Sequence, residues 1–222
     1  NGVDTPVAVP GGKIGAYVEG PYKPEKVTKW ASDLTADSDK VAWQLIFGPD
    51  QIKAALEENG QSLTVDGKTR STIMFTDELG PGQSYVTAKD KWRLETGTAE
   101  GKNASSVQLT DAAGTDQNTS AGDFDLDVTM TGDVAFIKVT GPFAPRSNYI
   151  VRYESTPDTE NGKVQAGVRY KNDAMALGTG LRGTYAVHYA SSFSINVEMK
   201  PGFGGFEITK LLTGTETGKV PA

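Results

Sequence analysis

Phe124-Asp-Leu-Asp-Val-Thr-Met130 alternates apolar and polar side chains along its whole length. Successive side chains of a β-strand point to opposite faces of a sheet, so this pattern predicts a strand with one buried and one solvated face. The same period recurs elsewhere, in 41–47, 73–77, 135–139, 149–153, 168–174 and 193–199. Many short strands separated by turn-forming residues favour an all-β sandwich.

One segment departs from the period of two. Residues 51–58 carry Ile52, Ala55 and Leu56 at the i, i+3, i+4 spacing of a helix, between a Pro-Asp start signal and an Asn-Gly stop signal. We therefore expect one short helix, which lies within an insertion at 48–68.

The chain of 222 residues suits one large sandwich with flanking segments. We expect a lead-in at 1–25, a sandwich domain at 26–201, and a linker with the first strand of a following domain at 202–222. Within the sandwich, 96–122 is rich in small and polar residues, which predicts a long, mobile surface loop with a short strand near 107–109.

Composition excludes several classes of protein. The net charge of −6 argues against nucleic acid and anionic membranes as partners. The absence of cysteine excludes disulfides and thiol catalysis, and a single histidine, His188, excludes a multi-histidine metal site. We expect no cofactor and no metal, although Asp123, Asp125 and Asp127 leave calcium as an alternative to a solvated strand face.

Three polar residues fall on faces that the alternation predicts to be buried. Asp77 continues the apolar face of 73–75, Asn172 lies within that of 170–174, and Lys29 lies on the inward face of a short early strand. Burying any one of them alone is costly. The simpler alternative is that each lies at a strand end and reaches water.

Together the three have a chemical use. Burial favours the neutral amine of a lysine, which is a nucleophile, and favours the neutral form of an aspartic acid. A protonated Asp77 can polarise the Asn172 carboxamide and move protons. The product would be an amide between Lys29 and Asn172, formed with loss of ammonia.

The same residues carry a family resemblance. Lys29 before Val41-Ala-Trp-Gln-Leu-Ile-Phe47, then Ile73-Met-Phe-Thr-Asp-Glu-Leu-Gly-Pro-Gly-Gln83 and Tyr170-Lys-Asn-Asp-Ala174, resembles the collagen-binding-type domains of Gram-positive surface adhesins. The resemblance extends over roughly 26–199.

This resemblance implies an immunoglobulin-like β-sandwich of the DEv-IgG type with an intramolecular isopeptide bond. By motif position it implies that Lys29 is the amine donor, Asn172 the acceptor and Asp77 the acid that promotes the reaction. Such a bond forms once, so the chain is not expected to be an enzyme.

The function expected from this resemblance is that of a bacterial adhesin domain linked to virulence, extracellular and anchored to the cell wall. It would be monomeric within a multidomain fibre and would bind a host extracellular matrix protein, with collagen as one candidate, or another cell-surface ligand. The alternative is a purely structural stalk domain of a fibre or pilus. A lectin-like sandwich is a third interpretation, which needs an acidic pair or a calcium site in a cleft. An exposed groove or apolar patch would favour ligand binding over a stalk.

Overall fold

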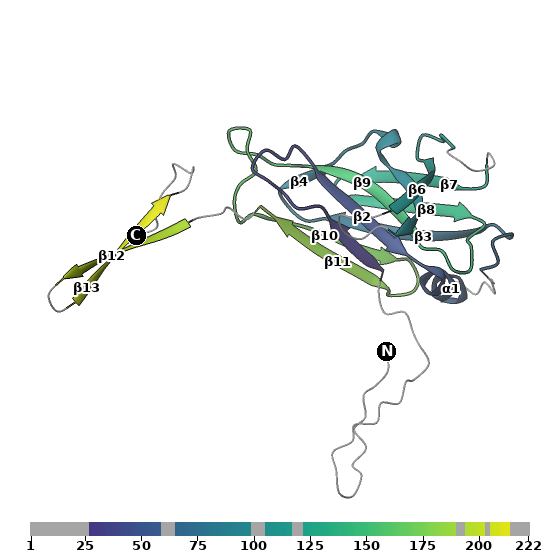
Figure 1. The fold of residues 1–222 in the computed structure, drawn as a ribbon. Helices are drawn as coiled ribbons and strands as arrows, with labels where there is room; N and C mark the ends of the chain where they lie inside the picture. The colour runs from purple at the N-terminus through teal and green to yellow at the C-terminus, as the bar shows by residue number, and fades with distance from the viewer. Residues whose placement is uncertain are drawn as a thin grey trace, which may run out of the picture.

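The computed structural model describes residues 27–58, 65–98, 105–116 and 122–189, together with the backbone of 194–202 and 205–213. Two antiparallel sheets pack face to face (Figure 1). The first has the order β1-β2-β9-β5-β6, with β4 also paired to β9, and the second has the order β11-β10-β3-β8-β7. The first sheet consists of β1 (Thr28–Ala31), β2 (Val41–Phe47), β4 (Gln83–Tyr85), β5 (Arg93–Thr98), β6 (Ser105–Asp111) and β9 (Tyr149–Pro157). The second consists of β3 (Ser71–Leu79), β7 (Asp125–Thr131), β8 (Val134–Gly141), β10 (Arg169–Ala176) and β11 (Arg182–His188).

The predicted all-β sandwich with one short helix is confirmed. The helix α1 (Pro49–Glu58) begins where the main-chain N–H of Gly48 donates to Gln51 Oε1 at 2.9 Å, which satisfies one of the free polar groups at the helix start. Its apolar stripe of Ile52, Ala55 and Leu56 is buried against the sandwich. A 3-10 turn at Lys89–Lys91 connects β4 to β5.

Aromatic side chains fill the space between the sheets. Phe47 of β2 and Phe75 of β3 lie with ring centroids 4.9 Å apart, and Phe143 and Tyr149 pack around them. Such pairs add to the stability that burial of their area provides. Because Phe47 and Phe75 belong to different sheets, this cluster fixes how the sheets face one another.

The prediction of a long loop at 96–122 is wrong for most of the described part of that segment, although the short strand predicted near 107–109 lies within β6. Thr96 pairs with Tyr149 of β9, and β6 pairs with β5 as a hairpin. Main-chain pairing of β5 with β9, and of β6 with β5, makes strands of residues whose small polar side chains are typical of loops. Val168, expected on the inner face, is 39% exposed because β10 begins one residue later.

The segment 193–199, expected to close the sandwich, pairs differently. In the described backbone, β12 (Ser194–Gly202) forms a two-stranded hairpin with β13 (Gly205–Thr213) and pairs with neither sheet. The sequence predicts the first strand of a following domain within 202–222, and the strand found there, β13, pairs with β12. The lead-in at 1–25 lies outside the described residues.

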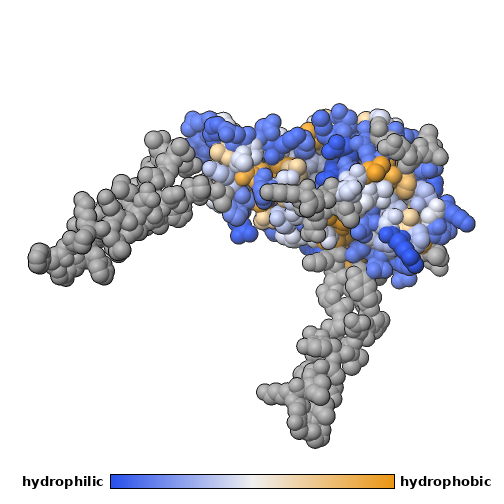
Figure 2. Space-filling model, viewed as in Figure 1, coloured by the Kyte–Doolittle hydropathy of each residue, from blue (hydrophilic) through white to orange (hydrophobic). Residues whose placement is uncertain are grey.

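The surface of the described sandwich is mainly hydrophilic on the face shown in Figure 2, with small scattered hydrophobic areas. None of the described helices has the length and apolar character needed to cross a bilayer.

Candidate functional site: a buried Lys-Asp-Asn cluster

Lys29 lies in β1, and its side chain points into the core. β1 pairs with β2, where Lys29 stands opposite the fully buried Leu45. On the other side β11 lies very close to the start of β1. A Cβ added at Gly183 of β11 would lie only 2.2 Å from the main-chain O of Val27. The lack of a side chain at Gly183 therefore lets the two sheets close around Lys29, whose side chain has no exposed surface.

Asp77 and Asn172 come from neighbouring strands of the second sheet. Asp77 stands opposite Ala174 and Asn172 opposite Leu79, so the two polar residues are diagonal neighbours on the inner face. Asn172 Nδ2 donates to Asp77 Oδ1 at 2.9 Å, and Lys29 Nζ, from the facing sheet, donates to Asp77 Oδ2 at 3.0 Å. The structure thus brings together the three residues that the sequence singled out.

The Asp77 carboxylate accepts four hydrogen bonds. Oδ1 accepts from Asn172 and, at 2.7 Å, from the hydroxyl of Tyr85, while Oδ2 accepts from Lys29 and from the hydroxyl of Tyr153. An ionised carboxylate has about four such acceptor positions, so all of them are filled. This arrangement fits an ion pair between Asp77 and Lys29. The protonated Asp77 expected from the sequence would arise by transfer of a proton from Lys29.

Tyr153 is the hub of the cluster. Its hydroxyl accepts from Lys29 Nζ and, at 3.0 Å, from Asn172 Nδ2, and donates to Asp77 Oδ2. The hydroxyl therefore contacts both nitrogens of the proposed reaction and the acid between them. The ring of Trp92 stacks on that of Tyr153 with parallel planes and a centroid separation of 4.3 Å, which holds the hydroxyl in place.

Burial determines the electrostatics of the cluster. It lowers the pKa of the Lys29 ammonium below its ordinary 10.5, although the Asp77 charge opposes this shift. Burial, with the Asp77 charge, raises the pKa of the Tyr85 and Tyr153 hydroxyls, so both stay neutral. The rings of Tyr153 and Trp43 lie 4.6 and 5.5 Å from Lys29 Nζ and exclude water from it. The site thus favours a lysine that can give up its proton.

The carboxamide oxygen of Asn172 is buried and accepts no hydrogen bond from any described residue. Leaving a buried acceptor unsatisfied costs about 1–3 kcal/mol, so native structures rarely contain such groups without a reason. The fold tolerates this cost at the carboxamide that the proposed reaction consumes.

A second row of hydrogen bonds supports Asn172 from the first sheet. Trp43 Nε1 donates to Ser155 Oγ at 2.8 Å, Ser155 Oγ donates to Gln83 Oε1 at 2.7 Å, and Gln83 Nε2 donates to the main-chain O of Lys171 at 2.7 Å. The chain ends on the residue before Asn172. It therefore ties β10 to β2, β9 and β4 beside the reacting group.

Sequence reasoning missed the roles of Tyr85 and Tyr153. Alternation places Tyr153 on an inward face, and a buried tyrosine hydroxyl needs a polar partner. That requirement was the available signal, but the partner comes from the opposite sheet. Gln83 belongs to the motif that carries the family resemblance, and its contacts with Ser155 and Lys171 give it a structural role.

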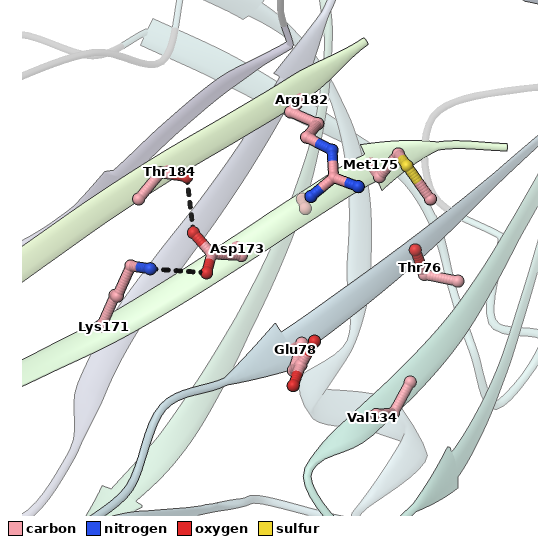
Figure 3. Close-up of a pocket in the computed structure, with 9 residues that line it drawn as sticks. Thr76, Glu78, Val134, Lys171, Asp173, Met175, Arg182 and Thr184 are labelled. Atoms are coloured by element: carbon pink, nitrogen blue, oxygen red, sulfur yellow. Dashed lines mark hydrogen bonds and ion pairs between the residues drawn. The ribbon is translucent and has the colours of Figure 1, made fainter. Parts of the chain in front are cut away.

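A second feature lies on the outer face of the second sheet. Side chains of β3, β8, β10 and β11 line an open hollow of about 410 Å³, where Asp173 is held by Lys171 at 2.8 Å and by Thr184 (Figure 3). On the same sheet, Met74 and Phe136 are 44% and 49% exposed beside a smaller hollow of about 230 Å³. This face therefore offers both a charged and an apolar surface.

Of the alternative calcium residues, Asp125 and Asp127 lie on the outer face of β7, and Asp123 lies in the bend before that strand. Asp125 is paired with Arg70, and Asp127 with Lys138 at 3.0 Å. In the described part of the chain, no group of three or more His, Asp or Glu side chains is arranged to hold a metal ion.

Several solved structures are similar to this chain. The collagen-binding domain from a Staphylococcus aureus adhesin is 17% identical with a TM-score of 0.41, over 73% of this chain and 96% of that one. The collagen binding subdomain of Enterococcus faecalis surface protein ACE is 20% identical with a TM-score of 0.40, over 77% and 99% of the two chains. The group B streptococcus pilus 2b backbone protein is 8% identical with a TM-score of 0.41, over 84% and 76%.

The first two structures are of the same kind as the domains that the sequence resembles. No curated protein matches the chain. A family model does match, over residues 24–202, which include the whole described sandwich and the Lys29, Asp77 and Asn172 cluster. By this match, the chain belongs to the family described as Domain of unknown function (DUF7926).

Proposed function

We propose that the chain is an extracellular domain of a bacterial cell-wall-anchored adhesin whose immunoglobulin-like sandwich is locked by an isopeptide bond between Lys29 and Asn172. The observation that carries this proposal is the fully buried cluster in which Asp77 contacts both of these side chains, at 3.0 Å and 2.9 Å. Burying a lysine, an aspartate and an asparagine in a dry core costs folding free energy unless the side chains pair with one another or react. The contacts of Asp77 with Lys29 and Asn172 support both pairing and reaction.

The reaction begins with transfer of a proton from Lys29 Nζ to Asp77 Oδ2, which leaves a neutral amine and a neutral acid. The amine lone pair attacks Asn172 Cγ, and a C–N bond forms. The bond from Cγ to Nδ2 then breaks, and Nδ2 takes up a proton and leaves as ammonia. Transfer of the second proton from Nζ to the departing ammonia yields the neutral amide, so the Lys29 ammonium and the Asn172 carboxamide give an amide plus an ammonium ion with no other reactant.

The bond would stabilise the fold through the unfolded state. It closes a loop with 142 residues, 30 through 171, between the joined positions. By analogy with a disulfide, a loop of this length corresponds to about 5 kcal/mol of lost unfolded-chain entropy. A chain without cysteine gains in this way a covalent constraint that reducing agents do not remove.

The intact mass of the purified chain tests this proposal. The wild type should be lighter than its sequence mass by one ammonia, while Lys29→Ala, Asp77→Ala and Asn172→Ala should keep the full mass. Lys40→Ala, which removes an exposed lysine paired with Glu154 at 2.8 Å, is the matched control and should still lose ammonia. A wild type at full mass would overturn the proposal.

The binding of a host extracellular matrix protein is a second candidate function, favoured by the hollows and exposed apolar residues on the outer face of the second sheet. Collagen is the first ligand to test, because it is the ligand of the domains that the sequence resembles. Phe136→Ala should weaken binding to immobilised collagen, whereas Val107→Ala, which removes a side chain 50% exposed on the other sheet, should not. Equal binding by both variants and the wild type would remove this face as the site. No binding by the wild type would favour the purely structural stalk domain.

A further inference from the structure

The hydroxyl of Tyr153 contacts both reacting nitrogens of the cluster and the acid between them. Asp77 touches the two reacting nitrogens with different oxygens: Lys29 Nζ lies 3.0 Å from Oδ2, and Asn172 Nδ2 lies 2.9 Å from Oδ1. The proton taken from the lysine therefore arrives on the oxygen that does not face the leaving nitrogen.

Asp77 is held against the rotation that would exchange its two oxygens. Tyr85 donates to Oδ1 at 2.7 Å and lies 2.8 Å from the main-chain O of Asp77, which fixes Oδ1 as an acceptor. Tyr153 is bound to Oδ2 on the other side. A carboxyl group clamped in this way needs another route to deliver its proton to Asn172 Nδ2.

We propose that the Tyr153 hydroxyl is a catalytic proton relay between Asp77 Oδ2 and Asn172 Nδ2. This inference rests on the proposed isopeptide bond. In the relay, the hydroxyl gives its proton to Nδ2 as the bond from Cγ to Nδ2 breaks, and Oδ2 returns its proton to the phenolic oxygen. The hydroxyl ends as it began, Asp77 is again ionised, and the nitrogen leaves as ammonia.

The surroundings of Tyr153 suit a concerted relay. Burial and the Asp77 charge disfavour a phenolate, so the hydroxyl passes a proton on only as it receives another. The hydroxyl lies 3.0 Å from Nδ2 and is bound directly to Oδ2, so both transfers take place between atoms that are already in contact. Both hydrogen bonds reverse direction once Asp77 is protonated and the attacked Asn172 Nδ2 carries a free lone pair. Stacking on Trp92 keeps the ring from turning away.

Tyr85 supplies a matched control. Both tyrosine hydroxyls donate to the Asp77 carboxylate, and both are buried, but the hydrogen bonds donated by the Tyr85 hydroxyl go to Asp77 alone. Removing either hydroxyl therefore takes one hydrogen bond from the same acid. Only Tyr153→Phe also removes the contact with the leaving nitrogen.

The experiment follows crosslinking of the full chain after cell-free synthesis. Translation is stopped, samples are quenched in acid at intervals, and intact mass gives the fraction that has lost ammonia. Tyr153→Phe should slow the reaction by about 10²-fold, as loss of a general acid does, whereas Tyr85→Phe should slow it by less than about 10-fold. Equal rates for the two variants would refute the relay while the crosslink itself stood. A wild type that stays at full mass would refute both.

A second substitution covers the case in which Tyr153→Phe does not fold. Placing 3-fluorotyrosine at position 153 by stop-codon suppression keeps the hydroxyl and the packing of the ring but makes the phenol more acidic. The pH profile of the crosslinking rate should then shift relative to the wild type, and the same residue at position 85 should leave the profile unchanged. A profile unaltered by the substitution at position 153 would overturn the relay.

Discussion

Gly183→Ala should disturb the crosslink without touching any residue that reacts. The new Cβ would lie 2.2 Å from the main-chain O of Val27 and 3.1 Å from Cγ of Lys29, whereas ordinary contacts begin near 3.4 Å. β1 must therefore retreat from β11 by about 1 Å, because the clash is with main chain and not with a flexible side chain. Overpacking of this kind costs about 1–3 kcal/mol of folding free energy.

The same displacement moves Lys29 Nζ away from Asp77 and Asn172. A shift of about 1 Å from a reactive geometry can slow a reaction by about 10²-fold. Timed intact-mass measurement gives this rate, and thermal unfolding of Gly183→Ala monitors its stability. The control is Gly180→Ala, at a turn position with φ +69° and no atom within 4 Å of the new Cβ. It should cost about 1 kcal/mol through backbone strain and leave the rate unchanged.

The opposite pattern would refute this reasoning. If Gly183→Ala crosslinks as fast as the wild type, the close approach of β1 and β11 does not position Lys29. If Gly180→Ala slows crosslinking to the same extent, the effect of Gly183→Ala reflects lost stability and not lost alignment.

Three further predictions concern the same cluster. A specific protease site can be inserted at the exposed Gly114, between the two joined positions. After cleavage the chain with Asn172 should run as one covalently joined species on a denaturing gel, while Asn172→Ala should separate into two fragments. Two fragments from the chain with Asn172 would contradict the bond. Asn172→Ala retains an unreacted Lys29 whose pKa is lowered by burial, so its folding free energy should become more favourable as pH rises from that lowered pKa towards 10.5, where the unfolded chain binds more protons than the folded one. Chemical denaturation at a series of pH values should show this slope. Lys29→Met in the same background should abolish it. Gln83→Ala should slow crosslinking by removing the tie to Lys171, as measured by intact mass, and an unchanged rate would show that the tie does not align Asn172.

The sequence sufficed to place the three central residues because alternation is local. Asp77 and Asn172 interrupt apolar faces of long strands, so their inward direction follows from the period of two. That both meet Lys29 depends on how two sheets face each other, and this meeting was indicated only by the chemistry that the three residues share and by the family resemblance.

The parts that sequence reasoning missed depend on non-local packing. Tyr153 looks like an ordinary core aromatic until the facing sheet supplies Asp77 and Asn172. Gly183 looks like a residue of a glycine-rich turn region, and its steric role appears only when β1 lies against it. Within 96–122 the end of β5 and the full length of β6 were missed, although a short strand was predicted near 107–109, because pairing of β5 with β9 and of β6 with β5 overrides the propensity of small polar residues.

The positions of Lys29 and Asn172 along the chain have a consequence for a domain under tension. Lys29 lies in the first strand of the sandwich and Asn172 in the next-to-last, so with the bond in place a pulling force entering near residue 29 passes through the side-chain amide to residue 172. The 142 residues between them are bypassed and carry no load. Without the bond, unfolding under force could extend these residues to a length of about 470–510 Å, at 3.3–3.6 Å per residue, whereas the bond prevents this extension.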